Sequence, residues 1–334
     1  MAMTGTGTIP INIEGFYDRN LLERTIQPAL LHNKFGQLRP LPKNMGSKIT
    51  FRRYGSLAAN TTQLTEGTTP AGKVLSSTEI SATMGQYGDF VIITDKLLDM
   101  GLDPILVEAG EILGDQAGLS LDTIYRAVLL AGTSVRYAGG VAARANIIKT
   151  IQKSDIQAAI RNLEQSNARK IRSMITPSVK VSTTPLRPGY IAITHTDCRQ
   201  DFENLADFIP VEKYSSQKDV MEEEIGEIFG VRVLVTTNAS IVADAGGTAV
   251  TNGLVYTTAN TACDVYQTLI LAKDAYGIIP LQKGNIENIV KKAQDSGTED
   301  PLNQRSTSGW KAYTTAKILN DNYLIRIEHG VTDL

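Results

Sequence analysis

The chain has 334 residues, 42% of them hydrophobic, which is enough apolar surface for one large domain or two ordinary ones. Its formal charge of −2 gives no broad basic field, which disfavours dedicated sequence-specific DNA binding and leaves local contacts with phosphates open. No apolar run of about eighteen residues and no secretory signal is present, so we expect no membrane span and a protein made and used in a cytoplasm. Cys198 and Cys263 are expected to be free thiols in that reducing compartment.

The first 45 residues are predicted to form an arm rather than a domain. A start rich in glycine and threonine precedes a short helix expected over residues 17–31. Pro40 and Pro42 impose an extended exit from this region.

Residues 48–94 contain two extended runs joined by a polar connection. Residues 48–54 and 77–94 carry β-branched and aromatic side chains with partial period-2 alternation, which is typical of strands. The connection, residues 55–76, is rich in threonine and glycine and has too few apolar residues to build its own core. A loop of about twenty residues in a compact domain is normally either disordered or built to contact something else. We therefore predict an arm that contacts another subunit.

A long helix is predicted from Asp103 to about Thr133. Asp103 suits the N-cap, Pro104 suits the first helical position, and an apolar stripe follows. Thirty helical residues span roughly 45 Å, which is the length of a spine for a whole domain.

Glycines recur at every fourth position on one face of this helix: Gly110, Gly114 and Gly118. Missing side chains would let another backbone approach closely, and Gly114→Leu would then overfill the contact. The alternative is a loosened or broken helix, because glycine is intrinsically costly inside helices.

Residues 135–280 are predicted to form a mixed α/β domain, with one sheet and helices on its faces. Helices are expected over residues 154–165, 197–206 and 217–224, and strands over residues 190–194, 231–237, 254–260 and 266–272. The last region, residues 285–329, is expected to end in a strand pair around residues 310–319 and 323–330.

Few patterns indicate chemistry. His195, Asp197 and Cys198 offer a base, an acid and a nucleophile, but proximity in sequence does not bring side chains to hydrogen-bond distance. Three histidines and no paired cysteine motif disfavour a zinc site at Cys198, and a partly buried polar turn is the better interpretation.

Two glycine pairs and one acidic run are also weak candidates. Gly139-Gly140 and Gly246-Gly247 lack the spacing of phosphate and dinucleotide loops, and both are expected to be turns. The acidic residues 222–224 would point in different directions from a helix, which favours a solvated face over a cation site. We predict no catalytic residue, no metal site and no cofactor, and hence no enzyme.

The densest basic cluster consists of Lys43, Lys48, Arg52 and Arg53. It fits equally a solvated strand edge that discourages unwanted pairing and a surface that bridges to a neighbouring subunit or to packaged nucleic acid.

Three blocks, residues 64–99, 222–239 and 300–330, resemble the hallmark blocks of the N-four-like bacteriophage major capsid proteins. They occur in the expected order and span most of the chain. The resemblance implies an α+β protein with the Hong Kong 97 phage capsid fold. It implies an N-terminal arm (1–45), an extended β-hairpin loop (46–94), a spine helix with a peripheral domain (95–153), an axial α/β domain (154–281) and a return to the peripheral domain (282–334).

The resemblance also implies a function. Such a protein assembles as hexamers and pentamers into an icosahedral shell around the double-stranded DNA of a tailed bacteriophage, in the cytoplasm of the bacterial host, and ends in the virion. Its partners would be further copies of itself, portal, scaffolding and decoration proteins, and the packaged DNA through non-specific contacts. Neither lysine–asparagine crosslinking nor cleavage of a scaffolding domain is predicted. The alternatives are a cellular encapsulating shell, which encloses cargo protein, and a soluble α/β enzyme, which needs a convergent pocket with perturbed titratable groups.

Under this interpretation the function lies in distributed interface burial, because an exposed arm needs a neighbour to cover its apolar side chains. The candidate apolar contacts are Phe51, Tyr54, Leu64, Leu75 and Met84. The candidate charged contacts are Arg52, Arg53, Glu66 and Lys73.

Overall fold

The structure, a computed structural model, describes residues 29–100, 105–176, 182–214, 220–248, 253–257, 262–281, 286–292, 301–302 and 304–333. It is an α+β protein whose chain divides into two compact units. The larger unit comprises Pro28–Gly88, Gln116–Glu287 and Lys311–Leu334, and the smaller unit includes Asp89–Asp115 and Asn288–Trp310.

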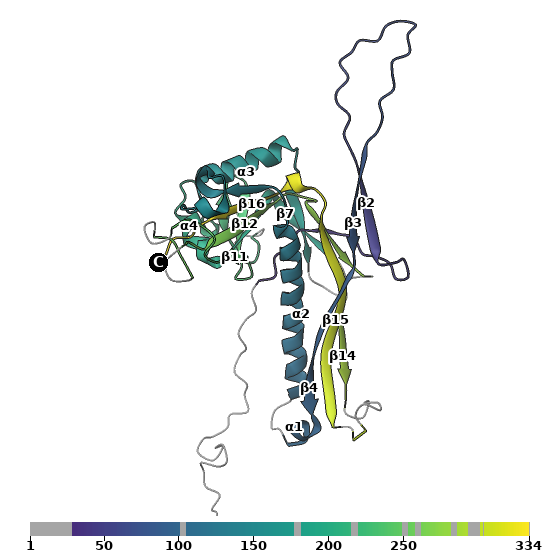
Figure 1. The fold of residues 1–334 in the computed structure, drawn as a ribbon, viewed down its shortest axis with the longest axis vertical. Coiled ribbons are helices and arrows are strands. Elements are labelled where there is room, and N and C mark those ends of the chain that lie inside the picture. Colours follow the sequence, from purple (N-terminus) through teal and green to yellow (C-terminus); the bar gives the residue numbers. More distant parts are fainter. Residues whose placement is uncertain are drawn as a thin grey trace, which may run out of the picture. The chain divides into compact units, whose positions relative to one another are not determined.

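The larger unit is built on a nine-stranded mixed sheet (Figure 1). Its strand order is β5 (Val135–Tyr137), β16 (Leu324–His329), β12 (Val265–Leu271), β7 (Ser182–Thr194), β10 (Val231–Val235), β9 (Glu224–Ile228) and β8 (Ile209–Pro210). Two further strands lie off this path: β6 (Ile171–Thr176) pairs with β7, and β11 (Ile241–Val242) pairs with β12. Strand β7 runs parallel to β10 and antiparallel to β12.

Both faces of this sheet are buried at its central strands, such as β10 and β12, where apolar side chains point to either side. On one face, Tyr190 and Val233 pack with Ile156 of α3 (Lys153–Gln165) and Phe202 of α4 (Arg199–Glu203). On the other face, the intervening side chains pack against the C-terminal part of α2 (Ile105–Leu130) and the preceding segment: Ile191, Ile193, Leu234, Leu269, Tyr125, Leu129, Leu31 and Phe35. The expected sheet with helices on its faces is therefore confirmed.

A second sheet has the strand order β1 (Gln37–Leu38), β13 (Tyr276–Pro280), β15 (Arg305–Ile318) and β14 (Glu287–Lys291), and β4 (Gly85–Thr94) also pairs with β15. In the smaller unit, Gly309 of β15 lies so close to β4 that an added Cβ would be 2.7 Å from the Cβ of Phe90. A side chain there would force the strands apart, which explains the glycine. Helix α1 (Asp95–Met100) directly follows β4.

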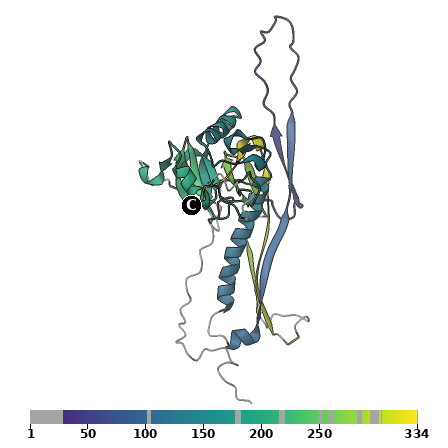
Figure 2. The same cartoon turned by 60° about the vertical axis from the view of Figure 1, so that its left-hand side comes forward.

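The predicted hairpin is present, with a different division of its second run. Strand β2 (Lys48–Tyr54) pairs antiparallel with β3 (Ser77–Thr83), from Lys48 opposite Thr83 to Tyr54 opposite Ser77. The run predicted as continuous over residues 77–94 breaks at Met84, after which β4 joins a different sheet. Figures 1 and 2 both show the connection between β2 and β3 as a loop that extends beyond the ends of the two strands.

Several predicted elements match the structure. Helix α2 runs unbroken from Ile105 to Leu130, although its predicted start at Asp103 and Pro104 lies outside the described residues. It ends three residues before the predicted Thr133, at a turn in which Gly132 N–H donates to the Leu129 carbonyl at 3.2 Å. Helices α3 and α4 and strands β7, β10 and β12 also match. The helix expected over residues 17–31 falls mostly outside the described residues, and residues 29–31 are not helical.

The helix predicted over residues 217–224 is wrong in its described part. Glu222 and Glu223 form a turn, Glu223 has φ of 63°, and Glu224 starts β9. The buried Glu224 carboxylate accepts from Nε of Arg232 on β10 at 2.8 Å. This cross-strand ion pair selects the strand over the local helical preference.

The strand predicted over residues 254–260 is also wrong in its described part. Leu254 forms only an isolated bridge with Thr332. The next residues are held as a loop, because the Asp264 carboxylate accepts from Thr257 N–H at 3.2 Å.

The last two predicted strands exist as β15 and β16, but they do not pair with each other. They belong to different sheets, and the chain changes sheet at Asn320. The chain also changes sheet between β12 and β13, and this connection lies beside the one at Asn320. Two hydrogen bonds join the two connections: Leu319 N–H donates to the Ala275 carbonyl and Ala272 N–H to the Tyr323 carbonyl, each at 2.9 Å. Two neighbouring crossovers thus replace the predicted hairpin.

Candidate subunit interface

The connection between β2 and β3, residues 55–76, is here called the arm. It contains no helix or strand, and every one of its residues is exposed. Hydrogen bonds within the arm join Gly55 N–H to the Ser76 carbonyl at 2.9 Å, Thr62 N–H to Asn60 Oδ1 at 3.4 Å, Thr68 N–H to the Thr65 carbonyl at 3.2 Å and Lys73 Nζ to the Ala58 carbonyl at 3.1 Å. The arm has no core to hold its conformation.

Four apolar side chains of the arm are largely in contact with solvent. The exposed fraction is 53% for Leu57, 69% for Leu64, 90% for Val74 and 64% for Leu75. Burying such a side chain contributes about 1.5–3 kcal/mol of stabilising free energy. The isolated subunit does not gain this stabilisation. An extended segment that exposes this much apolar surface is suited to contact another molecule.

The predicted contact residues at the base of the hairpin behave differently from those in the arm. Phe51 and Met84 are partly buried against a small cluster formed by Leu41, Ala82 and Ile279 of the same chain. This cluster anchors β2 and β3 to the larger unit, so these two side chains already serve the subunit's own fold.

The predicted charged contacts at the base also have partners in the chain. Arg52 donates to Glu79 across the β2–β3 ladder at 2.7 Å, and both side chains are more than half exposed. The hydrogen bond to Glu79 raises the pKa of Arg52. Arg53 donates to the Leu319 carbonyl at 3.4 Å. Tyr54, at the last strand pair, is 63% exposed.

Leu64, Glu66, Lys73 and Leu75 all lie in the exposed arm, as their prediction as contacts requires, while their contacts with another subunit stay a prediction. Leu57 and Val74 were missed, although their apolar character within a polar segment was a usable signal. In the smaller unit, further apolar side chains are more than 40% exposed: Phe90, Val91, Ile92, Leu97, Val107 and Ile112.

The three glycines of α2 have different surroundings in the subunit. An added Cβ would lie 2.9 Å from Leu30 Cδ1 at Gly118 and 4.0 Å from Ser308 Oγ at Gly110. At Gly114 it would have no neighbour within 4 Å among the described residues outside the helix's own backbone. Helix α2 continues through all three positions, so it is not broken by them. Open space at Gly114 leaves room for the predicted approach of another backbone.

A buried polar network ties the segment before β1 to α2. The Asp122 carboxylate accepts from His32 N–H at 2.9 Å, lies 2.8 Å from His32 Nδ1, and accepts from Asn238 Nδ2 at 2.8 Å. The Tyr276 hydroxyl donates to the His32 carbonyl at 2.6 Å. His32 and Asp122 are fully buried, so these bonds hold the entry of the chain firmly on the sheet's α2 face.

Of the residues considered for catalysis, His195 and Asp197 lie close together, with His195 Nδ1 3.1 Å from the Asp197 carboxylate, while Cys198 is buried. Asp197 N–H donates to His195 Nδ1 at 3.2 Å, and the Tyr266 hydroxyl donates to the Asp197 carboxylate at 2.8 Å. Burial raises the pKa of the Cys198 thiol to about 12, so the thiolate is not available near neutral pH. The three groups form the predicted polar turn around a buried, unreactive thiol.

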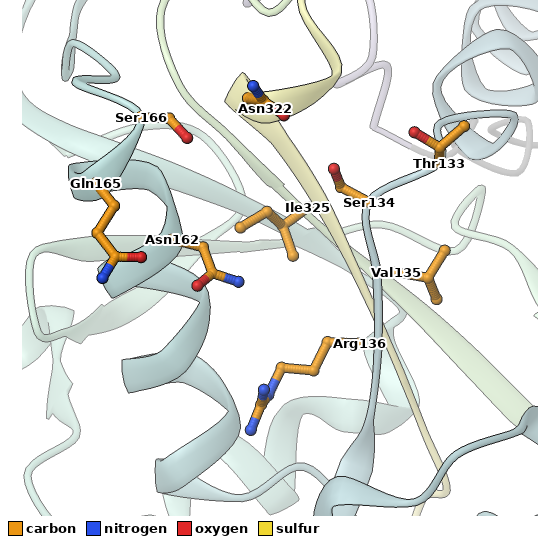
Figure 3. Close-up of a pocket in the computed structure, with 9 residues that line it drawn as sticks. All are labelled: Thr133, Ser134, Val135, Arg136, Asn162, Gln165, Ser166, Asn322 and Ile325. Carbon is orange, nitrogen blue, oxygen red and sulfur yellow. The ribbon is translucent and has the colours of Figure 1, made fainter.

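A polar cavity of about 430 Å³ lies between the end of α3 and the chain around β5 (Figure 3). It is lined by hydroxyl, amide and guanidinium groups and two apolar side chains: Thr133, Ser134, Arg136, Asn162, Gln165, Ser166, Asn322, Val135 and Ile325. Its one titratable side chain, Arg136, donates to the buried Asp155 carboxylate at 3.2 Å. The lining offers hydrogen bonds but no nucleophile paired with a base.

Within the described ranges, no group of three or more histidine, cysteine, aspartate or glutamate side chains could hold a metal ion. None of the helices in the described part of the chain is long and apolar enough to cross a membrane.

Comparison with known families identifies the class of protein. The profile of the family described as "Phage capsid protein" matches residues 77–325, about three quarters of the chain. The chain therefore belongs to the phage capsid protein family, whose members are structural proteins. The comparison with curated proteins gives no match.

Solved phage capsids share the fold over almost the whole chain. The capsid of Ralstonia phage GP4 aligns with a TM-score of 0.68 at 11% identity, covering 96% of each chain. The head of Helicobacter pylori bacteriophage KHP40 aligns at 0.65 and 11% identity, covering 99% of this chain and 98% of that one. The cyanophage Pam1 capsid aligns at 0.65 and 13% identity, covering 98% and 99%. The Hong Kong 97 phage capsid fold expected from the sequence is thereby confirmed.

Proposed function

We propose that this chain is the major capsid protein of an N-four-like tailed bacteriophage. It assembles as hexamers and pentamers into an icosahedral shell around double-stranded DNA. The observation that carries the proposal is the arm, whose four apolar side chains are more than half exposed in a chain of the phage capsid family. A closed shell supplies every arm with a neighbour that covers it.

The proposed division of labour follows the chain. Residues 1–45 act as the N-terminal arm, and residues 46–94 as the extended loop that overlaps a neighbouring subunit. Residues 95–153 provide the spine helix and peripheral domain, residues 154–281 the axial domain, and residues 282–334 the return to the peripheral domain.

Assembly is driven by burial rather than by chemistry. Burying apolar surface stabilises an interface by about 25 cal/mol per Å², so covering the arm's apolar side chains contributes a few kcal/mol to the free energy of each subunit contact. The entropy lost when the arm becomes ordered opposes this gain. Phe51 and Met84 hold the base of the hairpin, so that the arm projects from a fixed platform. Summed over a closed shell, weak contacts of this kind give a stable particle.

The proposed partners are further copies of the chain, the portal, scaffolding and decoration proteins, and the packaged DNA through non-specific phosphate contacts. No catalytic activity and no cofactor belong to the proposal. Assembly takes place in the cytoplasm of the bacterial host, and the finished protein resides in the virion.

A direct test is cryo-electron microscopy of the purified protein, with light scattering on the same sample. We expect closed shells, or six- and five-membered rings, whose density connects each arm to a neighbouring subunit. The proposal would be contradicted if the protein stayed monomeric when co-expressed with candidate scaffolding and portal proteins. Particles that form normally but enclose protein instead of DNA would favour the cellular encapsulating shell.

A further inference from the structure

A second cavity, of about 250 Å³, lies in the larger unit where three separate segments meet. It is lined by residues 34–38, by the first residues of β6, and by Lys273 and Asp274 in the turn between β12 and β13. Three of its side chains are cations, Lys34, Arg172 and Lys273, and one is an acid, Asp274. It is here called the basic pocket.

One further cation lies beside the basic pocket. Arg169 precedes β6 and is exposed. Lys273 N–H donates to the Arg169 carbonyl at 2.9 Å, which places the two segments side by side. The chain as a whole has slightly more acidic than basic residues, 35 against 33, so three cations against one acid in the lining of this cavity are a local excess.

Few carboxylates of the subunit neutralise these cations. Lys34 lies 3.1 Å from Glu222, whose side chain is 76% exposed, so the pair is weak and easily exchanged. Among the described residues, no carboxylate lies within 4.0 Å of the basic groups of Arg172 or Lys273. The exposed side chains of Arg172 and Lys273 are therefore available to an external anion.

The backbone beneath the basic pocket is held rigidly. Leu31 and Phe35 are buried in the core on the α2 face of the sheet, together with Ile171 at the start of β6. Gly36 sits so close to the ring of Tyr276 that an added Cβ would be 2.6 Å from Cε2, so only glycine lets the chain lie this close. The cations are therefore presented from fixed positions, which reduces the entropy cost of binding.

We propose that the basic pocket binds the phosphate backbone of double-stranded DNA, an inference that rests on the proposed function as a DNA-enclosing shell. A guanidinium fork and two ammonium groups match phosphate oxygens. A cavity of this size admits a phosphate group but no helix of a protein partner. A duplex offers one phosphate charge per about 1.7 Å of its length, so Arg169, whose carbonyl accepts from Lys273 N–H beside the pocket, can contact a neighbouring phosphate. The contact is independent of base sequence.

The test is fluorescence anisotropy with a labelled 30-base-pair duplex of random sequence, titrated at several salt concentrations. The pocket variant is Arg172→Gln with Lys273→Gln. The matched control is Arg161→Gln with Lys213→Gln, which removes one arginine and one lysine from exposed sites outside both basic clusters. We expect the pocket variant to lose about tenfold or more in affinity and to reduce the salt slope by about two units, while the control binds as the wild type does.

Three further readouts make the result decisive. Arg172→Lys, which keeps the charge, should retain the wild-type salt slope. Unchanged DNA binding in the pocket variant, or an equal loss in the control, overturns the inference, as does a pocket that binds a labelled polyglutamate peptide in preference to the duplex. Electron microscopy of the same preparations separates the two proposals. If shells form and the pocket variant binds DNA as the wild type does, only the pocket proposal is refuted. If the wild type forms no shells under any condition, the proposed function is refuted.

Discussion

The nine-stranded sheet and the arm treat apolar side chains in opposite ways, although both belong to the larger unit. Leu269 in β12 is 2% exposed and is packed within one subunit, whereas Val74 in the arm is 90% exposed and has no cover. The sheet makes the subunit stable on its own, and the arm makes it incomplete. Mutations in the two regions should therefore affect different properties, folding in the first case and assembly in the second.

The largest effect on folding is expected for Leu269→Ala. Removing a buried leucine leaves a cavity in the core, and we expect the free energy of unfolding to fall by about 2–5 kcal/mol. Leu64→Ala in the arm, the matched control, should change it by less than about 0.5 kcal/mol. Urea titration of unassembled subunits measures both. An equal fall in the free energy of unfolding for both variants would show that the arm contributes to the subunit's own core, and the proposed difference between sheet and arm would be wrong.

Asp122→Ala should have the next largest effect, because it removes the acceptor shared by His32 and Asn238. Each buried donor left without a partner costs about 1–3 kcal/mol. Asp122→Asn keeps one carbonyl oxygen as an acceptor, so its free energy of unfolding should fall less than that of Asp122→Ala. Urea unfolding of the two variants tests the network, and an alanine variant as stable as wild type would show that the buried bonds contribute nothing.

The stability of the sheet should decrease in two steps as the pH is lowered. Burial lowers the pKa of His329, so below its usual value of 6.5 the unfolded chain binds a proton that the folded chain resists. Burial favours the neutral form of Glu328, but hydrogen bonds from Arg144 and Gln267 outweigh it and lower the pKa of this carboxyl below 4.5. The stabilisation from Glu328 is therefore complete above that value and is lost as the pH falls through its folded pKa.

Unfolding of unassembled subunits between pH 8 and 3 checks this order. His329→Gln should flatten the pH dependence between about 6.5 and 4.5, and Glu328→Gln should leave that window unchanged and flatten the range below it. The reverse assignment, or a wild-type stability independent of pH, would refute the sign of the two shifts.

The smallest effect on folding is expected for Gly114→Leu. Outside the helix's own backbone, no atom of the described residues lies within 4 Å of a Cβ added there, and leucine favours helices by about 0.8 kcal/mol over glycine. The subunit should be equally or slightly more stable, while assembly measured by sedimentation should fall if another backbone packs there. Normal assembly of this variant would remove the close-packing explanation of the glycine row.

Much of the fold could be predicted from the sequence where local patterns and tertiary contacts agree. Strand β12 is mostly apolar because both its faces are buried, and α2 carries a long apolar stripe because half of it lies on the sheet. The failures occur where distant contacts decide. Glu224 forms a strand because of Arg232, and Asp264 holds a loop that resembles a strand. No local pattern contains either pairing.

The candidate interface could be predicted only in part, for a related reason. The composition of residues 55–76 indicates an exposed arm, because a segment without apolar mass has no core to join. It does not separate Phe51, which anchors the hairpin to its own subunit, from Leu64, which is free. That distinction depends on Leu41 and Ile279, which are brought to the hairpin only by the fold.

The measurement that tests the central claim most directly is the assembly of a variant without the arm. Replacing residues 55–76 by Asn-Gly joins Tyr54 to Ser77 through a two-residue turn suited to the β2–β3 hairpin. The account predicts folded subunits with wild-type thermal stability by circular dichroism and no closed shells by cryo-electron microscopy. Closed shells formed as readily as by the wild type, in the same host and with the same partners, would contradict it.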